Sequence, residues 1–128
     1  MTITINDHRK IFAIQEEFHS MFPYLKIEFF AKPSNTRASS SKKIMKHPGK
    51  TLGECRVIHT KGVITITPHM TVANLEQNFS DVYGLSVLLM RKSGNAWLET
   101  SLTDDWTLEQ QNNLGMELCE WKQKSKVA

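Results

Sequence analysis

A pattern that occurs twice along the chain constrains its fold more than any other feature of the sequence. Residues 2–5 are matched 61 positions later by residues 63–66. The same offset continues through a helix-like stretch, and after one deleted residue the match continues into the next strand-like stretch. The clearest aligned pairs are Ile14 with Leu75, Phe18 with Phe79, and Leu25 with Leu85. Self-similarity at a fixed period indicates one structural unit used twice, so we expect a duplicated β-α-β-β unit over residues 1–60 and 61–102.

The first copy carries the local signals of its elements. Ile11, Ile14 and Phe18 recur at spacings of three and four residues, which predicts an amphipathic helix. Asp7 precedes this stretch and is expected to cap the helix. Residues 24–30 then alternate between polar and apolar, as a half-buried strand does.

The second copy repeats this logic and is followed by a further helix. Thr71 and Gly84 mark the start and the end of its helix. Residues 93–95 predict a tight turn between two antiparallel strands. A C-terminal helix is expected over residues 107–121, where Thr107 and Gln110 have the spacing of a capping box.

These patterns predict one α+β domain of two layers. The chain has 128 residues, of which 40% are hydrophobic, so it can form a single core. We expect a mostly antiparallel sheet of about five to seven strands with helices on one face, plus the C-terminal helix. A ferredoxin-like β-α-β-β-α-β core with additions is the alternative. A sheet with open edges and one open face also suggests a homodimer.

Charge is distributed unevenly, and its main concentration lies where the two copies differ. Residues 33–50 replace a short hairpin turn, and residues 51–55 after them align with residues 96–100. The stretch from Lys32 to Lys50 contains no acidic residue, and a basic segment can attract phosphate groups. The candidate anion-binding residues in it are Arg37, Lys42, Lys43 and Lys46. Its polar, serine-rich composition is equally typical of a flexible loop, and it lacks the interleaved aromatic residues of single-strand binding surfaces.

Asp104, Asp105 and Trp106 form the second candidate site. Carboxylates at this spacing do not fit a calcium-binding loop, and they complement the dipole of the helix that follows. An exposed Trp106 beside two aspartates would be a suitable anchor for a protein partner. Packing of the tryptophan between the last helix and the sheet is the structural alternative.

No residue pattern predicts catalysis, a cofactor or a metal. The five histidines lie singly, and Cys55 and Cys119 form no paired motif and are expected to be small buried residues. His59, Glu54 and Tyr83 would support a ligand-binding or enzymatic pocket only if the fold joined them in a deep cavity. The sequence has no signal peptide and no membrane span, so a cytoplasmic location is expected.

Several segments in the second half of the chain also resemble a group of known proteins. The stretch from Asn78 to Leu85, the residues Arg91 to Gly94 and 97–100, and the run from Thr103 to Leu108 resemble a family of small uncharacterised bacterial proteins of the Bacteroidetes type. The resemblance implies a bacterial cytoplasmic protein and brings no activity, ligand or catalytic residue. Our leading hypothesis is therefore a non-enzymatic module that binds a protein partner, with nucleic-acid or anion binding through residues 33–50 as the alternative.

Overall fold

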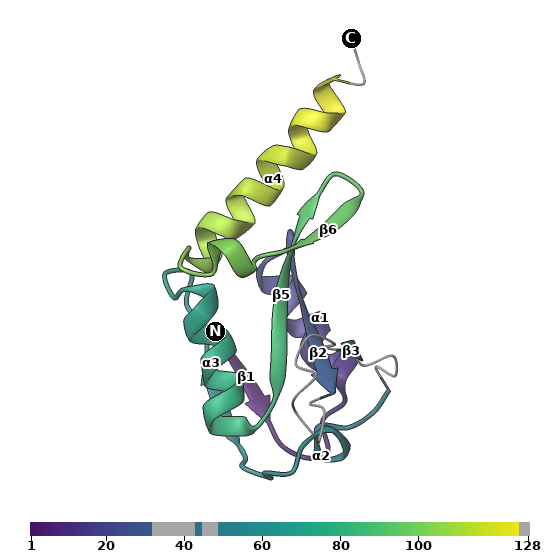
Figure 1. Ribbon diagram of the computed structural model, residues 1–128, viewed down its shortest axis with the longest axis vertical. Coiled ribbons are helices and arrows are strands. Elements are labelled where there is room, and N and C mark those ends of the chain that lie inside the picture. The colour runs from purple at the N-terminus through teal and green to yellow at the C-terminus, as the bar shows by residue number, and fades with distance from the viewer. Residues whose placement is uncertain (32–42, 45–48, 126–128) are drawn as a thin grey trace.

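The computed structural model describes residues 1–31, 43–44 and 49–125 of an α+β domain (Figure 1). The helices are α1 (Ile11–Met21), α2 (Leu52–Cys55), α3 (Val72–Tyr83) and α4 (Leu108–Ser125), with a 3-10 turn η1 (Ser101–Thr103) before α4. The strands are β1 (Thr2–Ile5), β2 (Leu25–Ala31), β3 (Lys43–Ile44), β4 (Gly62–Thr65), β5 (Ser86–Ser93) and β6 (Ala96–Glu99). No helix in the described parts of the chain is long and apolar enough to cross a membrane.

The strands form two separate antiparallel sheets. β3, β2, β5 and β6 make a four-stranded sheet in that order, whereas β1 and β4 pair only with each other as a two-stranded ribbon. Our expectation of one sheet of about five to seven strands is therefore wrong. The physical reason is the one-sided alternation of β1, whose buried Ile3 and Ile5 face the core while Thr2 and Thr4 face solvent. The ribbon can thus close over the apolar face of the larger sheet instead of extending it.

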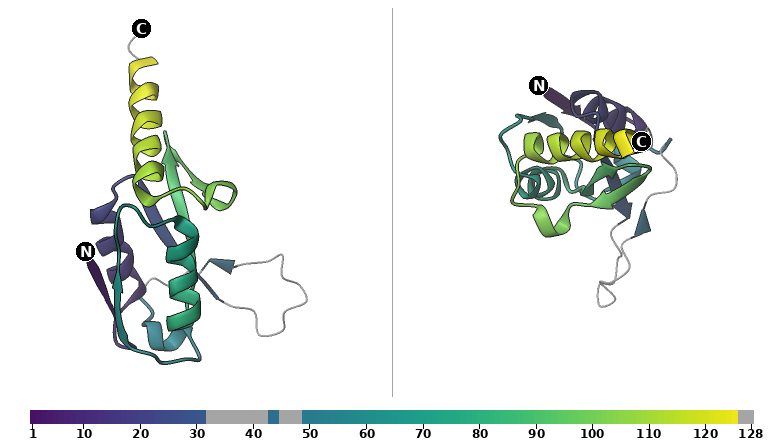
Figure 2. Two further views of the ribbon diagram at one scale, coloured as in Figure 1. Left: turned by 90° about the vertical axis from the view of Figure 1, so that its left-hand side faces the viewer. Right: turned by 90° about the horizontal axis from the view of Figure 1, so that it is seen from above.

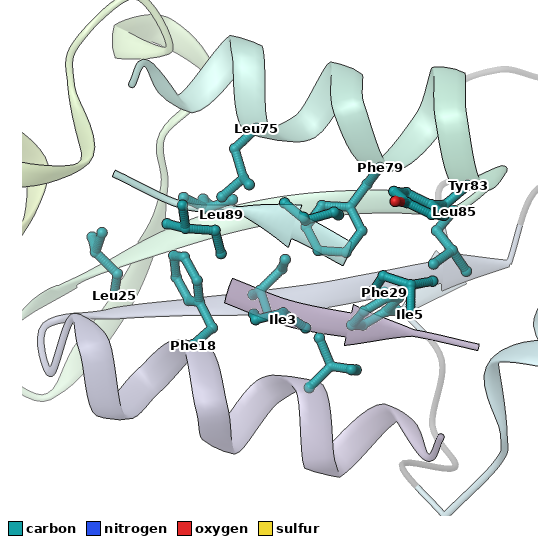
Figure 3. Packing of buried hydrophobic residues seen from close by; sticks show 14 of the residues in the cluster. Ile3, Ile5, Phe18, Leu25, Phe29, Leu75, Phe79, Tyr83, Leu85 and Leu89 are labelled. Carbon is teal, nitrogen blue, oxygen red and sulfur yellow. The ribbon is translucent and has the colours of Figure 1, made fainter. Parts of the chain in front are cut away.

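The core lies between the ribbon and one face of the larger sheet, with α1 and α3 on either side (Figure 3). The rings of Phe29 from β2 and Phe79 from α3 pack edge to face, with centroids 6.0 Å apart. Phe18 of α1 is fully buried in the same cluster. The helices are thus on one face of the four-stranded sheet, as predicted, and the opposite face of the sheet is free of them.

The two halves of the chain share a set of backbone hydrogen bonds at matching positions. The Ile11 amide donates to the Lys50 carbonyl at 2.9 Å, and the Val72 amide, 61 positions later, donates to the Trp106 carbonyl at 3.0 Å. Two further pairs of bonds match in the same way. The amides of Leu52 and Leu108 donate to the carbonyls of Arg9 and Met70, and the amides of Gly53 and Glu109 donate to the carbonyls of Asp7 and Pro68. The start of α2 therefore corresponds to the start of α4. A common origin of the two halves stays a prediction.

This correspondence corrects one part of the sequence alignment. Residues 51–55 form the N-cap and the turns of α2, whereas Ala96–Glu99 form strand β6, so the alignment of these two segments is wrong. Both segments contain apolar residues and one glutamate. Over so few residues the sequence does not distinguish one helical turn from a short strand.

The predicted helix caps agree with the structure at three points and differ at one. Thr71 accepts a hydrogen bond from the Asn74 amide, Gly84 ends α3 with a φ of 64°, and the Thr107–Gln110 capping box forms with bonds of 2.9 and 3.1 Å. Asp7 does not cap α1, because the N-cap residue of α1 is Lys10, whose side chain makes no capping hydrogen bond. The Asp7 carboxylate is occupied by Arg56 and His59 instead.

The basic segment 33–50 contains one short strand. Lys43 and Ile44 of β3 pair with Ala31 and Phe30 of β2, so the segment is not a continuous loop. Residues 33–42 and 45–48 lie outside the described residues. The C-terminal helix is longer than predicted, since it extends to Ser125 and projects from the body of the domain (Figure 2).

Candidate functional site

The side of the four-stranded sheet opposite the core is a mixed polar and apolar surface. Lys26 and Glu28 of β2 point away from the buried Leu25, Ile27 and Phe29, because successive side chains of a strand face opposite sides. Phe30, Leu88 and Met90 also lie on this side, and the first two are only 8% exposed. On β6, Trp97 pairs with Lys92 and is half-buried.

The edge of β2 is closed by α1 rather than by another strand along most of its length. Gln15 donates from Nε2 to the Ile27 carbonyl at 2.9 Å, and His19 Nδ1 lies 3.0 Å from the Leu25 carbonyl. A carbonyl oxygen can only accept, so Nδ1 of His19 carries a proton in this contact. The bonded carbonyls are no longer available to a partner strand, which leaves side-chain docking as the way to use this surface.

A groove of about 470 Å³ runs between α1 and β2 and is bordered by Trp97. Its surface is mostly apolar. Its lining comprises Phe12, Gln15, Glu16, His19, Ser20, Lys26, Ile27, Glu28 and Trp97. The volume is within the range of sites that hold a small molecule or a few side chains of a partner.

Trp97 is surrounded by basic side chains at one end of the groove. The Lys26 ammonium lies 4.9 Å from the centroid of the indole and the Lys92 ammonium 5.9 Å. The His19 ring meets the indole edge to face at 6.3 Å. Cation–π contacts of this kind hold the indole in place and keep positive charge next to an apolar surface.

Acidic side chains balance part of this charge. Glu28 lies 3.3 Å from Lys26, so that cation is paired. Lys92 has no ion pair among the described residues, and Glu16 lies on the α1 wall of the groove. The groove therefore has a basic, aromatic end and carboxylates along its side, and it is not a uniformly basic channel.

None of the described residues that the sequence singled out lines this groove. Arg37, Lys42 and Lys46 lie outside the described residues. Lys43 belongs to β3, next to β2.

Asp104, Asp105 and Trp106 lie in the turn between η1 and α4. The Asp104 carbonyl accepts from the Ala73 amide at 2.8 Å, which ties this turn to the first turn of α3. Trp106 is 37% exposed. Its ring is thus partly at the surface, as the partner-anchor hypothesis requires, and Leu102 in the same turn is 99% exposed.

The side chains of His59, Glu54 and Tyr83 each interact with a different partner. Tyr83 donates to the Val63 carbonyl at 3.2 Å, and Glu54 interacts with Thr51 at the start of α2. His59 Nδ1 lies 2.9 Å from Asp7 instead. Each of the three side chains has a separate structural partner, and none of them lines the groove.

Asp7 is the centre of a charge cluster that sequence reasoning missed. The Arg56 side chain is fully buried and donates to Asp7 from Nε at 3.1 Å and from Nη2 at 2.9 Å. Its Nη1 donates to the Tyr83 carbonyl at the end of α3 at 3.0 Å. Hydrogen bonds from His59 and then from Arg56 lower the pKa of Asp7 below its ordinary value. The cluster joins β1, α2 and α3 and is a structural clamp.

The described residues contain no group of three or more His, Cys, Asp or Glu side chains that could hold a metal ion. Cys55 and Cys119 are half-buried, and burial raises the pKa of the Cys55 thiol, which makes it a poor nucleophile. Comparison with known proteins gives no match, since no family model, curated protein or solved structure is significantly similar to this chain.

Proposed function

We propose that this protein is a non-enzymatic interaction module whose groove between α1 and β2 receives an apolar side chain of a protein partner. The observation that carries the proposal is the half-buried Trp97 at the border of a mostly apolar groove of about 470 Å³. Aromatic residues in such positions supply much of the binding energy of protein interfaces. A bacterial cytoplasmic setting is part of the same proposal.

The chemistry of the lining favours binding over catalysis. His19 is the natural general base there, with its Nδ1 oriented by the Leu25 carbonyl, but no nucleophilic side chain among the described residues is hydrogen-bonded to its ring. Ser20 donates to the Glu17 carbonyl at 2.9 Å and not to His19. The described lining thus holds no nucleophile and base in hydrogen-bond contact, which a hydrolytic site would need.

The charges of the lining favour a protein partner over nucleic acid. Glu16 and Glu28 face the groove, and carboxylates repel a phosphate backbone. Nucleic-acid binding remains the second candidate, because Lys43 and Ile44 of the basic segment 33–50 form β3, which pairs with the groove strand β2. Salt-dependent binding of a single-stranded oligonucleotide that is lost on deleting residues 34–48 would favour this second candidate.

A displayed library of random peptides tests the leading proposal. Peptides selected on the wild-type protein are measured by fluorescence anisotropy against Trp97→Ala and against Val57→Ala, a change at an exposed apolar residue outside the groove. We expect Trp97→Ala to weaken binding at least about tenfold, as loss of an interface anchor does, and Val57→Ala to leave it unchanged. Selected peptides that bind Trp97→Ala as well as wild type would refute the groove as the binding site.

A further inference from the structure

The segment between β6 and α4 presents two exposed apolar side chains and two aspartates, a surface called the knob and defined as Leu102, Asp104, Asp105 and Trp106. Leu102 is 99% exposed and Trp106 37% exposed. The backbone that carries them is held by a bond of 3.1 Å from the Thr103 amide to Thr100 and one of 3.0 Å from the Trp106 amide to Thr103. The knob is thus part of the ordered fold, and its leucine side chain is left in water.

The anchoring of the knob extends into the domain. Gln111 of α4 donates from Nε2 to the Thr103 carbonyl at 2.8 Å and accepts from Arg91 at 2.7 Å. Thr100, the residue before η1, is fully buried and donates to the Leu89 carbonyl. A large exposed leucine on so fixed a support is typical of a contact surface, because pre-organisation lowers the entropic cost of binding.

The knob and the groove complement each other in charge and in polarity. Asp104 and Asp105 have no ion pair among the described side chains, and Lys92 beside Trp97 has none either. An apolar tip flanked by two carboxylates matches the Trp97 end of the groove, where the Lys26 and Lys92 ammonium groups lie beside the indole; Glu16 and Glu28 line the groove as well, so the match in charge is confined to that end. We propose that the groove of one copy of this protein binds the knob of a second copy. This proposal rests on the proposed function and names the partner.

The contact joins two different surfaces and therefore has a recognisable stoichiometry. No knob residue lines the groove of its own chain. Each bound pair consequently retains one free groove and one free knob, so association continues with concentration unless the rotation between copies closes a ring. If the groove of one copy and the knob of another copy are blocked, the remaining knob and the remaining groove can form only one contact between the two copies.

Sedimentation of two complementary variants tests this geometry. Trp97→Ala removes the groove anchor and Leu102→Asp removes the knob tip. We expect the mass of the wild type to rise with concentration, and each variant alone to remain at 14.7 kDa with self-affinity reduced at least about tenfold. An equimolar mixture of the two variants is expected to form a particle of two chains and nothing larger.

Val57→Asp is the matched control, because Val57 is 93% exposed and lies outside both surfaces, and it should associate like the wild type. Lys92→Glu mixed with Asp105→Lys provides a second pair that leaves Trp97 in place. Each variant alone should associate more weakly than the wild type, and the mixture should regain association.

A wild type that stays at the mass of one chain up to millimolar concentration would overturn self-recognition. Association that survives Leu102→Asp or Trp97→Ala would do the same. Peptide binding in the groove would be unaffected by either result, so failure of this proposal is distinguishable from failure of the proposed function.

Discussion

At the scale of single residues, the buried guanidinium of Arg56 shows how one side chain joins distant segments. It donates to Asp7 after β1 and to the Tyr83 carbonyl at the end of α3. A buried cation requires such partners, because leaving water is costly unless hydrogen bonds and an opposite charge replace the lost hydration. The clamp therefore contributes to stability only while all of its members are present.

Replacing Arg56 with alanine should destabilise the fold by about 2–3 kcal/mol, because it removes three charge-assisted hydrogen bonds and leaves the Tyr83 carbonyl without this donor. Urea denaturation of the purified protein measures the change. Arg9→Ala is the control: Arg9 pairs with Glu17 nearer the surface, and the loss should be below about 1 kcal/mol. Equal losses in both variants would contradict the structural role of Arg56.

The same clamp should make stability depend on pH in the acidic range. The pKa of Asp7 in the folded protein lies below its ordinary value of 3.8 because His59 and Arg56 stabilise the carboxylate. The ionised Asp7 carboxylate therefore stabilises the folded protein at a pH above the pKa that Asp7 has in the unfolded chain. This stabilisation is lost as the pH falls through the lower pKa of Asp7 in the folded protein. Asp7→Asn should therefore lose stability less steeply than the wild type as the pH falls below about 4.

Urea midpoints measured across the acidic range give this comparison. Asp81→Asn, at an exposed aspartate of α3, is the control and should keep the slope of the wild type. If the urea midpoint of Asp7→Asn falls with pH as steeply as that of the wild type, Asp7 is not a source of the acid sensitivity.

At the scale of elements, local signals predicted much of the fold. Thr71, Gly84 and the Thr107–Gln110 box act through bonds to residues close in sequence, so the residue types alone indicate them. The separate ribbon of β1 and β4 was not predictable in this way, because pairing between distant strands depends on how the whole core closes. The groove was missed for the same reason, since Trp97 and Lys26 belong to strands far apart in the chain.

Gly115 in α4 shows a conflict between local propensity and packing. Glycine weakens a helix by about 1 kcal/mol relative to alanine. A Cβ at this position would, however, lie 2.8 Å from the Cβ of Tyr24 and 3.3 Å from the Lys92 carbonyl. The glycine lets α4 approach the ends of β2 and β5, and this close contact positions the helix that follows the knob.

Gly115→Ala should therefore destabilise the protein by about 1 kcal/mol or more, because overpacking costs more than the gain in helix propensity. Thermal unfolding followed by circular dichroism measures the effect. The neighbouring Met116→Ala, at a position 36% exposed, should change stability little. A more stable Gly115→Ala protein would show that α4 does not pack closely on the sheet.

At the scale of the whole molecule, the core side of the sheet carries the helices and α4 projects beyond the body (Figures 1 and 2). The groove on α1 and β2 and the knob before α4 are therefore both accessible to another molecule. Their chemistry is complementary at the Trp97 end of the groove, and of the groove residues only Ile27 belongs to the core cluster. We propose that these two surfaces, rather than the clamp or the cysteines, carry the function of the protein.

A nuclear magnetic resonance titration can identify the bound surface residue by residue. Isotope-labelled Leu102→Asp protein, which retains its groove, is titrated with unlabelled Trp97→Ala protein, which retains its knob. We predict that the indole N–H of Trp97 and the amides of Gln15, His19 and Lys26 shift, and that unlabelled protein with both substitutions causes no shift. Unchanged groove signals, or shifts gathered around Val57 instead, would contradict the groove as the interaction surface.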